Sequence, residues 1–396
     1  MERAGFQKVT VLLDRILSVC EHLKEFRCSA NHIPLKLSAI CLTKTTSLTR
    51  LELIKAAIDV STIESMLRCS PLIEELIVSE SKEDFTHLFE RYCPRLNLLA
   101  INSDGWNHSL NTPRKNGLYG KLHYAHFRRI SFSRHLFSLL QKNDEALETL
   151  EIGSLKGTEA DWQQLSTFTA PNLKHLTLYL FCKPVRFHAA DILRLHSNVQ
   201  TLELYNLDDE GMNMEFTGTS SISSMLTAVA SMRNLSELFL SYCFVPKDKP
   251  CADQLFEHFA AQGQDAPFKR LTLLHCNYIL HFDLSSITKI SSLTHLALLG
   301  EDYESLSEPD IVDLARNIGL MPKLSVFAVH VSKFSVDAAQ YIVSCASLRH
   351  IYVETSTEWT SRLLEDVIDE DTKEFLTSHN IKVAKLGYNC HYFDTF

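Results

Sequence analysis

The chain of 396 residues is poor in glycine and lacks the short motifs that many enzymes carry. It has only 12 glycines, and no G-x-G-x-x-G, P-loop, G-x-S-x-G or H-E-x-x-H sequence occurs. Glycine-rich loops cradle phosphates, and the last two motifs mark a nucleophilic serine and a zinc site. The absence of all four predicts a protein that is not an enzyme and needs no cofactor.

Positive charge and long apolar runs are also scarce. The formal net charge is -9, whereas nucleic-acid binding requires a basic surface, so we expect no nucleic-acid partner. No run approaches the 18 or more apolar residues of a membrane span. The opening apolar segment is interrupted by Asp14 and Arg15, so we do not expect it to be a signal peptide. We expect a monomer in the cytosol or nucleus with no membrane contact.

A short apolar pattern is what the chain does contain. In "CPRLNLLAI" (93–101) the apolar residues Leu96, Leu99 and Ile101 are spaced at intervals of three and two. The second and third suit one face of a strand, where side chains alternate with period 2, and the first suits a bend that precedes it. We call the three residues first, second and third anchors.

The pattern recurs through nearly the whole chain. We count thirteen copies, whose first anchors run from Leu23 to Leu348. The mean period of about 27 residues lies within the range of leucine-rich repeats. One of the copies is Phe127, Ile130 and Phe132. One such repeat cannot bury its apolar face alone, so we expect the copies to stack.

Helix-like segments separate the strands. They include 61–70, 190–198, 224–232 and 310–321. Ser61 and Glu64 form a possible capping box, and Pro309 suits a first helical turn. Strands joined by helical crossovers run parallel. The sequence predicts one α/β leucine-rich-repeat solenoid over 1–396, with recognisable repeats over about 12–390, a parallel sheet on the concave face of a horseshoe and helices on its convex face.

The 11 cysteines follow the repeat rather than a disulfide or metal pattern. Cys20, Cys93 and Cys345 each lie three residues before a first anchor, and Cys243 and Cys276 three after a third. A small apolar thiol suits such turns, so buried free thiols are expected. No C-x-x-C occurs, and "HCNYILHF" (275–282) places its potential ligands on a strand end and on the next connection. We expect no metal site.

The residues that alternate with the anchors should line the concave face. In the second half of the chain they include the aromatic, histidine and arginine types that are enriched in protein interfaces. We predict that a protein partner binds there, although aromatic residues also suit strands for their own sake. The predicted contact residues are His175, Tyr179, Glu203, Tyr205, Glu237, Phe239, Arg270, His295, His330, His350 and Tyr352.

Three long insertions follow third anchors, at 102–117, 206–222 and 245–254, and should share one rim of the horseshoe. Trp106 is the candidate contact residue among them. Its alternative role is to fix its own loop.

Some copies of the repeat resemble those of a known family. Cys93-Pro-Arg-Leu96-x-x-Leu99-x-Ile101 resembles the cysteine-containing leucine-rich repeats of F-box proteins, which have the ribonuclease-inhibitor-like solenoid. Leu235-x-x-Leu238-x-Leu240-x-x-Cys243 and Phe268-x-x-Leu271-x-Leu273-x-x-Cys276 resemble them too. The resemblance implies a substrate-recognition module of a cullin-type ubiquitin ligase, whose adaptor is held by an amino-terminal F-box.

The chain departs from this family at its start. Only 22 residues precede Leu23, and we find no F-box among them. Either the protein is a repeat protein with another role, or an amino-terminal part is missing from this chain. The alternative function is a regulatory scaffold that resembles GTPase-activating repeat proteins of the Ran-specific kind.

Overall fold

The structure is a computed structural model. It describes residues 16, 19–20, 22–29, 35–37, 44–54, 56–79, 85–102, 121–128, 130, 132–153, 155, 157–180, 183–206, 219–241, 249–274, 284–300, 308–331, 333–354 and 367–385. The chain divides into two compact units, 1–188 and 189–396, which are treated separately below. That the chain forms a single domain stays a prediction.

Strands and helices alternate in both units, as the repeat predicts. The strands of the first unit are β1 (Glu25–Ser29), β2 (Leu35–Leu37), β3 (Arg50–Ile54), β4 (Ala56–Ile58), β5 (Glu75–Ser79), β6 (Leu98–Asn102), β7 (Tyr124–Arg128), β8 (Thr149–Gly153) and β9 (His175–Tyr179). Its helices are α2 (Val60–Arg68), α3 (His87–Tyr92), α4 (Arg134–Lys142) and α5 (Glu159–Leu165), and the boundary between the units falls within α6 (Lys183–Leu195).

The second unit continues the same order. Its strands are β10 (Thr201–Tyr205), β11 (Glu237–Ser241), β12 (Arg270–Leu274), β13 (His295–Leu299), β14 (Val326–His330), β15 (His350–Glu354) and β16 (Lys382–Lys385). Its helices are α7 (Thr219–Ala230), α8 (Lys249–Ala261), α9 (Leu284–Thr288), α10 (Glu308–Ile318), α11 (Val336–Ile342) and α13 (Glu370–Ser378).

Polar side chains mark the helix starts. In α5, Thr158 and Asp161 form a reciprocal capping box. In α2 the cap is Asp59, which accepts a hydrogen bond from the Thr62 amide at 2.7 Å. The predicted capping box at Ser61 is therefore wrong: the N-cap is Asp59, two residues earlier, and the Ser61 hydroxyl donates to Asp59 instead. Pro309 does lie in the first turn of α10, as predicted.

The main strands are parallel, in the order β1-β3-β5-β6-β7-β8-β9 in the first unit and β10 through β16 in the second, while β2 and β4 form a separate pair. Before most strands, a backbone carbonyl accepts hydrogen bonds from two amides of the next repeat. The Ser236 carbonyl, for example, accepts from the Lys269 amide at 2.8 Å and the Arg270 amide at 2.9 Å. Because this arrangement recurs, successive strands begin in the same register.

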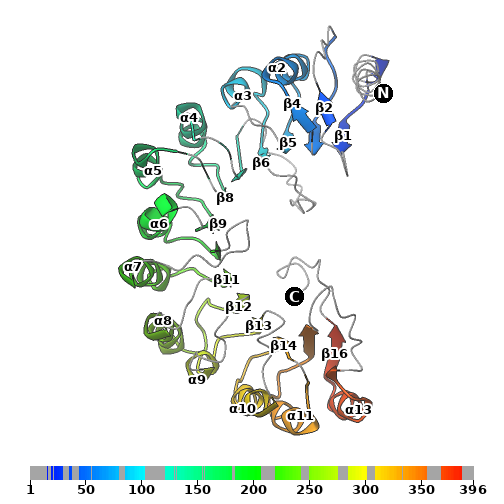
Figure 1. Ribbon diagram of the computed structural model, residues 1–396, viewed down its shortest axis with the longest axis vertical. Coiled ribbons are helices and arrows are strands. Elements are labelled where there is room, and N and C mark those ends of the chain that lie inside the picture. Colours follow the sequence, from blue (N-terminus) through cyan, green and yellow to red (C-terminus); the bar gives the residue numbers. More distant parts are fainter. Residues whose placement is uncertain are drawn as a thin grey trace. The chain divides into compact units, whose positions relative to one another are not determined.

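The hydrophobic core lies between the sheet and the helices of each unit. The described helices lie along one side of the strands (Figure 1), and the second anchors Leu51, Leu176 and Leu271 are fully or almost fully buried there. Phe268, the first anchor of β12, stacks on Phe259 of α8 with ring centroids 4.1 Å apart. Since side chains alternate along a strand, the residues between the anchors point to the other side. We call that side the helix-free face.

The predicted leucine-rich-repeat solenoid of the α/β class is confirmed, and twelve of the thirteen predicted copies coincide with strands. The copy at Phe127, Ile130 and Phe132 is wrong. The anchors of β7 are Leu122, Ala125 and Phe127, because Ala125 pairs with Leu99 of β6. Because the second anchor of β7 is a small alanine, the spacing of large apolar residues does not identify this repeat.

Two further departures concern the end of the array and the cysteines. Strand β16 was not predicted, because Lys385 occupies its third-anchor position opposite Val353. Cys93 and Cys345 are buried free thiols, as predicted, whereas Cys20 is exposed. The Cys345 thiol donates to the Met321 carbonyl at 3.1 Å and so links two neighbouring turns. Cys243 and Cys276 lie outside the described residues.

Candidate functional site

The helix-free face of the second unit is built from aligned rows of side chains. Neighbouring strands are in register, so that Glu237, Arg270 and His295 form one row across β11, β12 and β13. Phe239, two residues further along β11, belongs to a parallel row that runs from Glu203 of β10 through Ala297, Ala328 and Tyr352 to Ala384 of β16. Each repeat therefore contributes one side chain to every row.

The centre of this face is apolar. A cluster of buried side chains spans four strands, and the half-buried rings of Tyr205 and Tyr352 pack against it. The Tyr205 ring lies 4.9 Å from that of Phe239, and its hydroxyl donates to Glu203 at 3.1 Å. The buried members of the cluster are Phe239, Leu274, Ala297, Leu299 and Ala328.

A row of polar groups lies along the strand starts beside this cluster. The Arg270 guanidinium is 3.6 Å from the Glu237 carboxylate. His295 shares a hydrogen bond of 2.8 Å with the Thr294 hydroxyl. Burial, and then the charge of Arg270, lower the pKa of His295 to about 4, so this imidazole is neutral at physiological pH. The His350 ring stacks on Tyr352 at 6.2 Å.

The predicted contact residues differ in their exposure to solvent. Phe239 is 2% exposed and His330 is 4% exposed, although the sequence placed both on a solvent-facing row. The other predicted residues of the second unit are half-buried: Glu203, Tyr205, Glu237, Arg270, His295, His350 and Tyr352. His175, which is exposed, and Tyr179 belong to the first unit. Trp106 lies outside the described residues. Partner binding by these residues stays a prediction.

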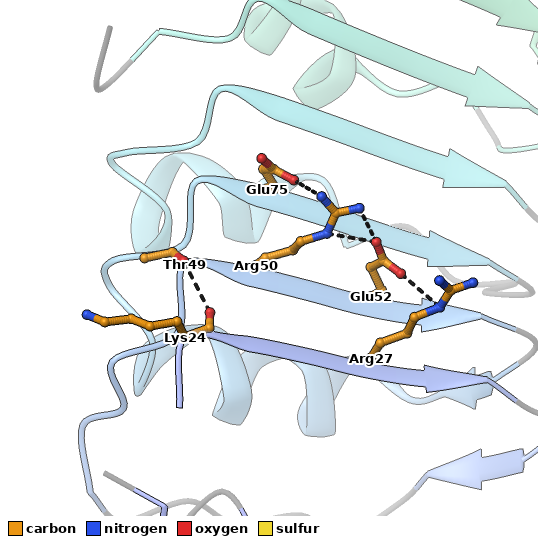
Figure 2. A network of polar contacts seen from close by, with 6 residues as sticks. All are labelled: Lys24, Arg27, Thr49, Arg50, Glu52 and Glu75. Carbon is orange, nitrogen blue, oxygen red and sulfur yellow. Dashed lines mark hydrogen bonds and ion pairs between the residues drawn. The ribbon is translucent and has the colours of Figure 1, made fainter. Parts of the chain in front are cut away.

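The first unit has a different helix-free face, on which charges pair across β1, β3 and β5. Figure 2 shows Arg50 between Glu52 and Glu75, with Arg27 on the far side of Glu52. Arg50 Nη1 lies 2.6 Å from Glu75 Oε2, Arg50 Nε lies 2.7 Å from Glu52 Oε1, and Arg27 Nε lies 3.1 Å from Glu52 Oε2. The positive and negative side chains largely compensate one another.

A second polar group in the first unit was missed by the sequence interpretation. Glu151 of β8 accepts a hydrogen bond from the Tyr124 hydroxyl at 2.5 Å, and its other oxygen lies 2.6 Å from Nδ1 of the fully buried His126. Tyr124 also packs against the apolar residues Ile77, Leu98 and Ala100. Because the anchors of β7 were misplaced, its outward residues Tyr124 and His126 were not identified. The alternation within "YAHFR" is the signal that could have located them.

Neither unit brings together a metal-binding group in the part of the chain that is described. No cluster of three or more His, Cys, Asp or Glu side chains there could hold a metal ion. Among the same residues, no helix combines the length and apolar character of a membrane span. What the geometry offers is a broad face with an apolar centre and polar borders.

Comparisons with known proteins give only distant likenesses. No protein-family profile and no curated protein matches the chain. Its fold is similar to the leucine-rich-repeat-containing protein LegL7 from Legionella pneumophila, at 13% identity and a TM-score of 0.36, covering 62% of this chain and 85% of that one. A Bacteroides fragilis protein has 12% sequence identity and a TM-score of 0.36, and the match covers 68% of this chain and 76% of that one. TLR13, in its complex with ssRNA13, has 11% sequence identity and a TM-score of 0.35, and the match covers 88% of this chain and 61% of that one. These values carry no information on function.

Proposed function

We propose that the chain is a non-enzymatic recognition module that holds a protein partner on the helix-free face of the second unit. The observation that carries the proposal is the pair of half-buried tyrosines, Tyr205 and Tyr352, beside an apolar cluster with Glu237, Arg270 and His295 along one side. Protein interfaces combine an apolar, aromatic centre with a polar border in this way. Tyrosine adds contact area at low entropic cost, which makes Tyr205 and Tyr352 the principal contact residues.

We further propose that this module is the substrate-recognition part of an F-box-like cullin-type ubiquitin ligase receptor that works in the cytosol or nucleus. The support is the resemblance of its cysteine-containing repeats to those of F-box proteins. Cys93 and Cys345 occupy the same place before a first anchor, and both thiols are buried. The adaptor of the ligase would contact a region outside the repeats.

Affinity purification from native lysate, followed by mass spectrometry, tests both proposals. The informative variant combines Tyr205→Ala, Tyr352→Ala and Arg270→Glu. Phe239 is left intact because truncation of a buried side chain would destabilise the fold. The control is Leu320→Ala with Tyr341→Ala, which removes two exposed apolar side chains from the turn after α10 and from α11.

The two proposals fail in different ways. A target protein that is recovered with the wild type and the control, and lost with the face variant, supports recognition. Equal recovery with all three chains refutes it. Cullin-ligase components alongside the target support the receptor role, and a stoichiometric target without any of them refutes that role alone.

A further inference from the structure

Charge is segregated within the second unit. We define the pre-strand segments as the residues from the end of each helix to the first residue of the next strand. In the second unit these segments are 196–201, 231–237, 262–270, 289–295, 319–326, 343–350 and 379–382. They contain seven basic residues and two acidic ones, whereas the described helices α7, α8, α9, α10, α11 and α13 contain three basic residues and nine acidic ones. The basic residues are Arg233, Lys269, Arg270, Lys289, Lys323, Arg349 and Lys382.

This excess is a property of the second unit rather than of the repeat. In the first unit the described residues that lead into β1, β3, β5, β6, β7, β8 and β9 hold six basic and six acidic side chains. The same turns are thus electrically balanced in one unit and strongly basic in the other, although the whole chain carries a net charge of -9.

Internal ion pairs neutralise only part of the excess. Glu237 pairs with Arg270, and Asp265 lies 3.2 Å from the Lys323 ammonium. The other five cations form no ion pair with the described part of the chain. Four of them are exposed and Lys269 is half-buried. We call these five the basic strip: Arg233, Lys269, Lys289, Arg349 and Lys382.

The repeat aligns three members of the strip, Lys269, Arg349 and Lys382, across the strand starts, while Arg233 and Lys289 lie in the turns just before β11 and β13. The Lys269 carbonyl accepts from the Thr294 amide, and the Arg349 carbonyl accepts from the Lys382 amide, both at 2.8 Å, so these residues belong to one backbone ladder. The strip runs from the turn before β11 to β16, which is five strand spacings of about 4.8 Å, or about 24 Å. At about 3.3 Å per residue, an extended peptide of roughly seven residues has the same length.

We propose that the basic strip docks an extended acidic segment of a protein partner. Charge complementarity selects the acidic chain, and the spacing of the cations suits a backbone that crosses the strand starts. A single-stranded nucleic acid would need exposed rings on which to stack. In the described pre-strand segments of the second unit, Phe268 is the one Phe, Tyr or Trp residue, and it is fully buried. The acidic helices would also repel a long polyanion.

This docking goes beyond the recognition proposed for the helix-free face and uses none of its contact residues. The test measures fluorescence anisotropy of a labelled peptide of about eight glutamates, at ionic strengths of about 0.05 M and 0.15 M. The strip variant carries Arg233→Glu, Lys289→Glu and Lys382→Glu. The matched control carries Lys24→Glu, Arg95→Glu and Lys121→Glu, which reverse three exposed charges in the corresponding turns of the first unit.

We expect the affinity of the wild type for the peptide to weaken as the salt concentration rises. Relative to the wild type, the affinity should fall by about tenfold or more in the strip variant and change by less than about twofold in the control. The Tyr205→Ala/Tyr352→Ala variant should bind the peptide like the wild type, which separates this docking from the proposed function. Equal losses in the strip variant and the control, or no loss in the strip variant, would overturn the proposal. Tighter binding of an oligouridine RNA or of phosphatidylserine vesicles than of the peptide would overturn it as well.

Discussion

The guanidinium of Arg128 in β7 lies 4.9 Å from the centroid of the Tyr179 ring in β9, so it spans the intervening strand β8. The residue in register between them is Gly153. A Cβ atom at Gly153 would lie 2.9 Å from Cδ2 of Tyr179 and 3.2 Å from Cγ of Arg128. The cation and the ring therefore meet because the middle strand has no side chain at this point.

Gly153→Ala should lower the free energy of unfolding by about 1 to 3 kcal/mol, since the added methyl group forces the Tyr179 ring and the Arg128 stem apart. Urea unfolding of the wild type and the variant measures the change. In a Tyr179→Ala background the clash with the ring is gone, so the penalty of Gly153→Ala should shrink. Equal penalties in both backgrounds would contradict this account.

Glu52→Gln should also destabilise the protein. Glu52 is 5% exposed and accepts hydrogen bonds from Arg50, with Arg27 on its other oxygen. Loss of its charge leaves Arg50 partly buried beside a neutral amide, which costs about 1 to 3 kcal/mol. The control is Glu370→Gln, whose exposed pair with Lys373 on α13 should contribute less than about 0.5 kcal/mol. A Glu52→Gln variant as stable as that control would show that the network in Figure 2 adds nothing to stability.

The regular part of the fold could be predicted from the sequence, because the apolar residues that recur at a fixed spacing are the ones that the fold buries. Leu238, Leu271 and Leu296 are second anchors in the sequence and adjacent, buried partners in the sheet. The pattern failed where an anchor is not a large apolar residue. Ala125 is buried yet small, and Lys385 of β16 is a polar third anchor.

The face of the sheet was harder to predict than its core. Alternation correctly assigned Tyr205 and Phe239 to the helix-free face, but it could not show that Phe239 is buried there against Leu274 and its neighbours. Contacts between strands depend on register and on side-chain rotamers, which a single repeat does not encode. The bridge from Arg128 to Tyr179 is of this kind, since it joins residues two strands apart.

The thiols should differ sharply in reactivity. Burial raises the pKa of Cys93 to about 12, whereas Cys20 is exposed. Because the thiolate is the nucleophile, about one Cys93 in ten thousand would be reactive at pH 8. We expect brief treatment with iodoacetamide to alkylate Cys20 in the native protein and Cys93 only after unfolding, as measured by mass spectrometry of the peptides. Equal native labelling of the two residues would contradict the burial of Cys93.

The low pKa of His295 should make stability depend on pH. The folded state holds this imidazole neutral down to about pH 4, whereas the unfolded chain binds a proton near the ordinary value of 6.5. The unfolded state therefore binds more protons between these values, so the stabilising contribution is complete above about pH 6.5 and is lost as the pH falls towards 4.

His295→Gln should flatten this part of the curve of urea midpoint against pH. Some slope should remain, because burial also lowers the pKa of His196. Parallel curves for the wild type and His295→Gln would mean that the folded protein admits a proton at His295 as readily as the unfolded chain does. In that case neither burial nor the charge of Arg270 would lower the pKa of His295.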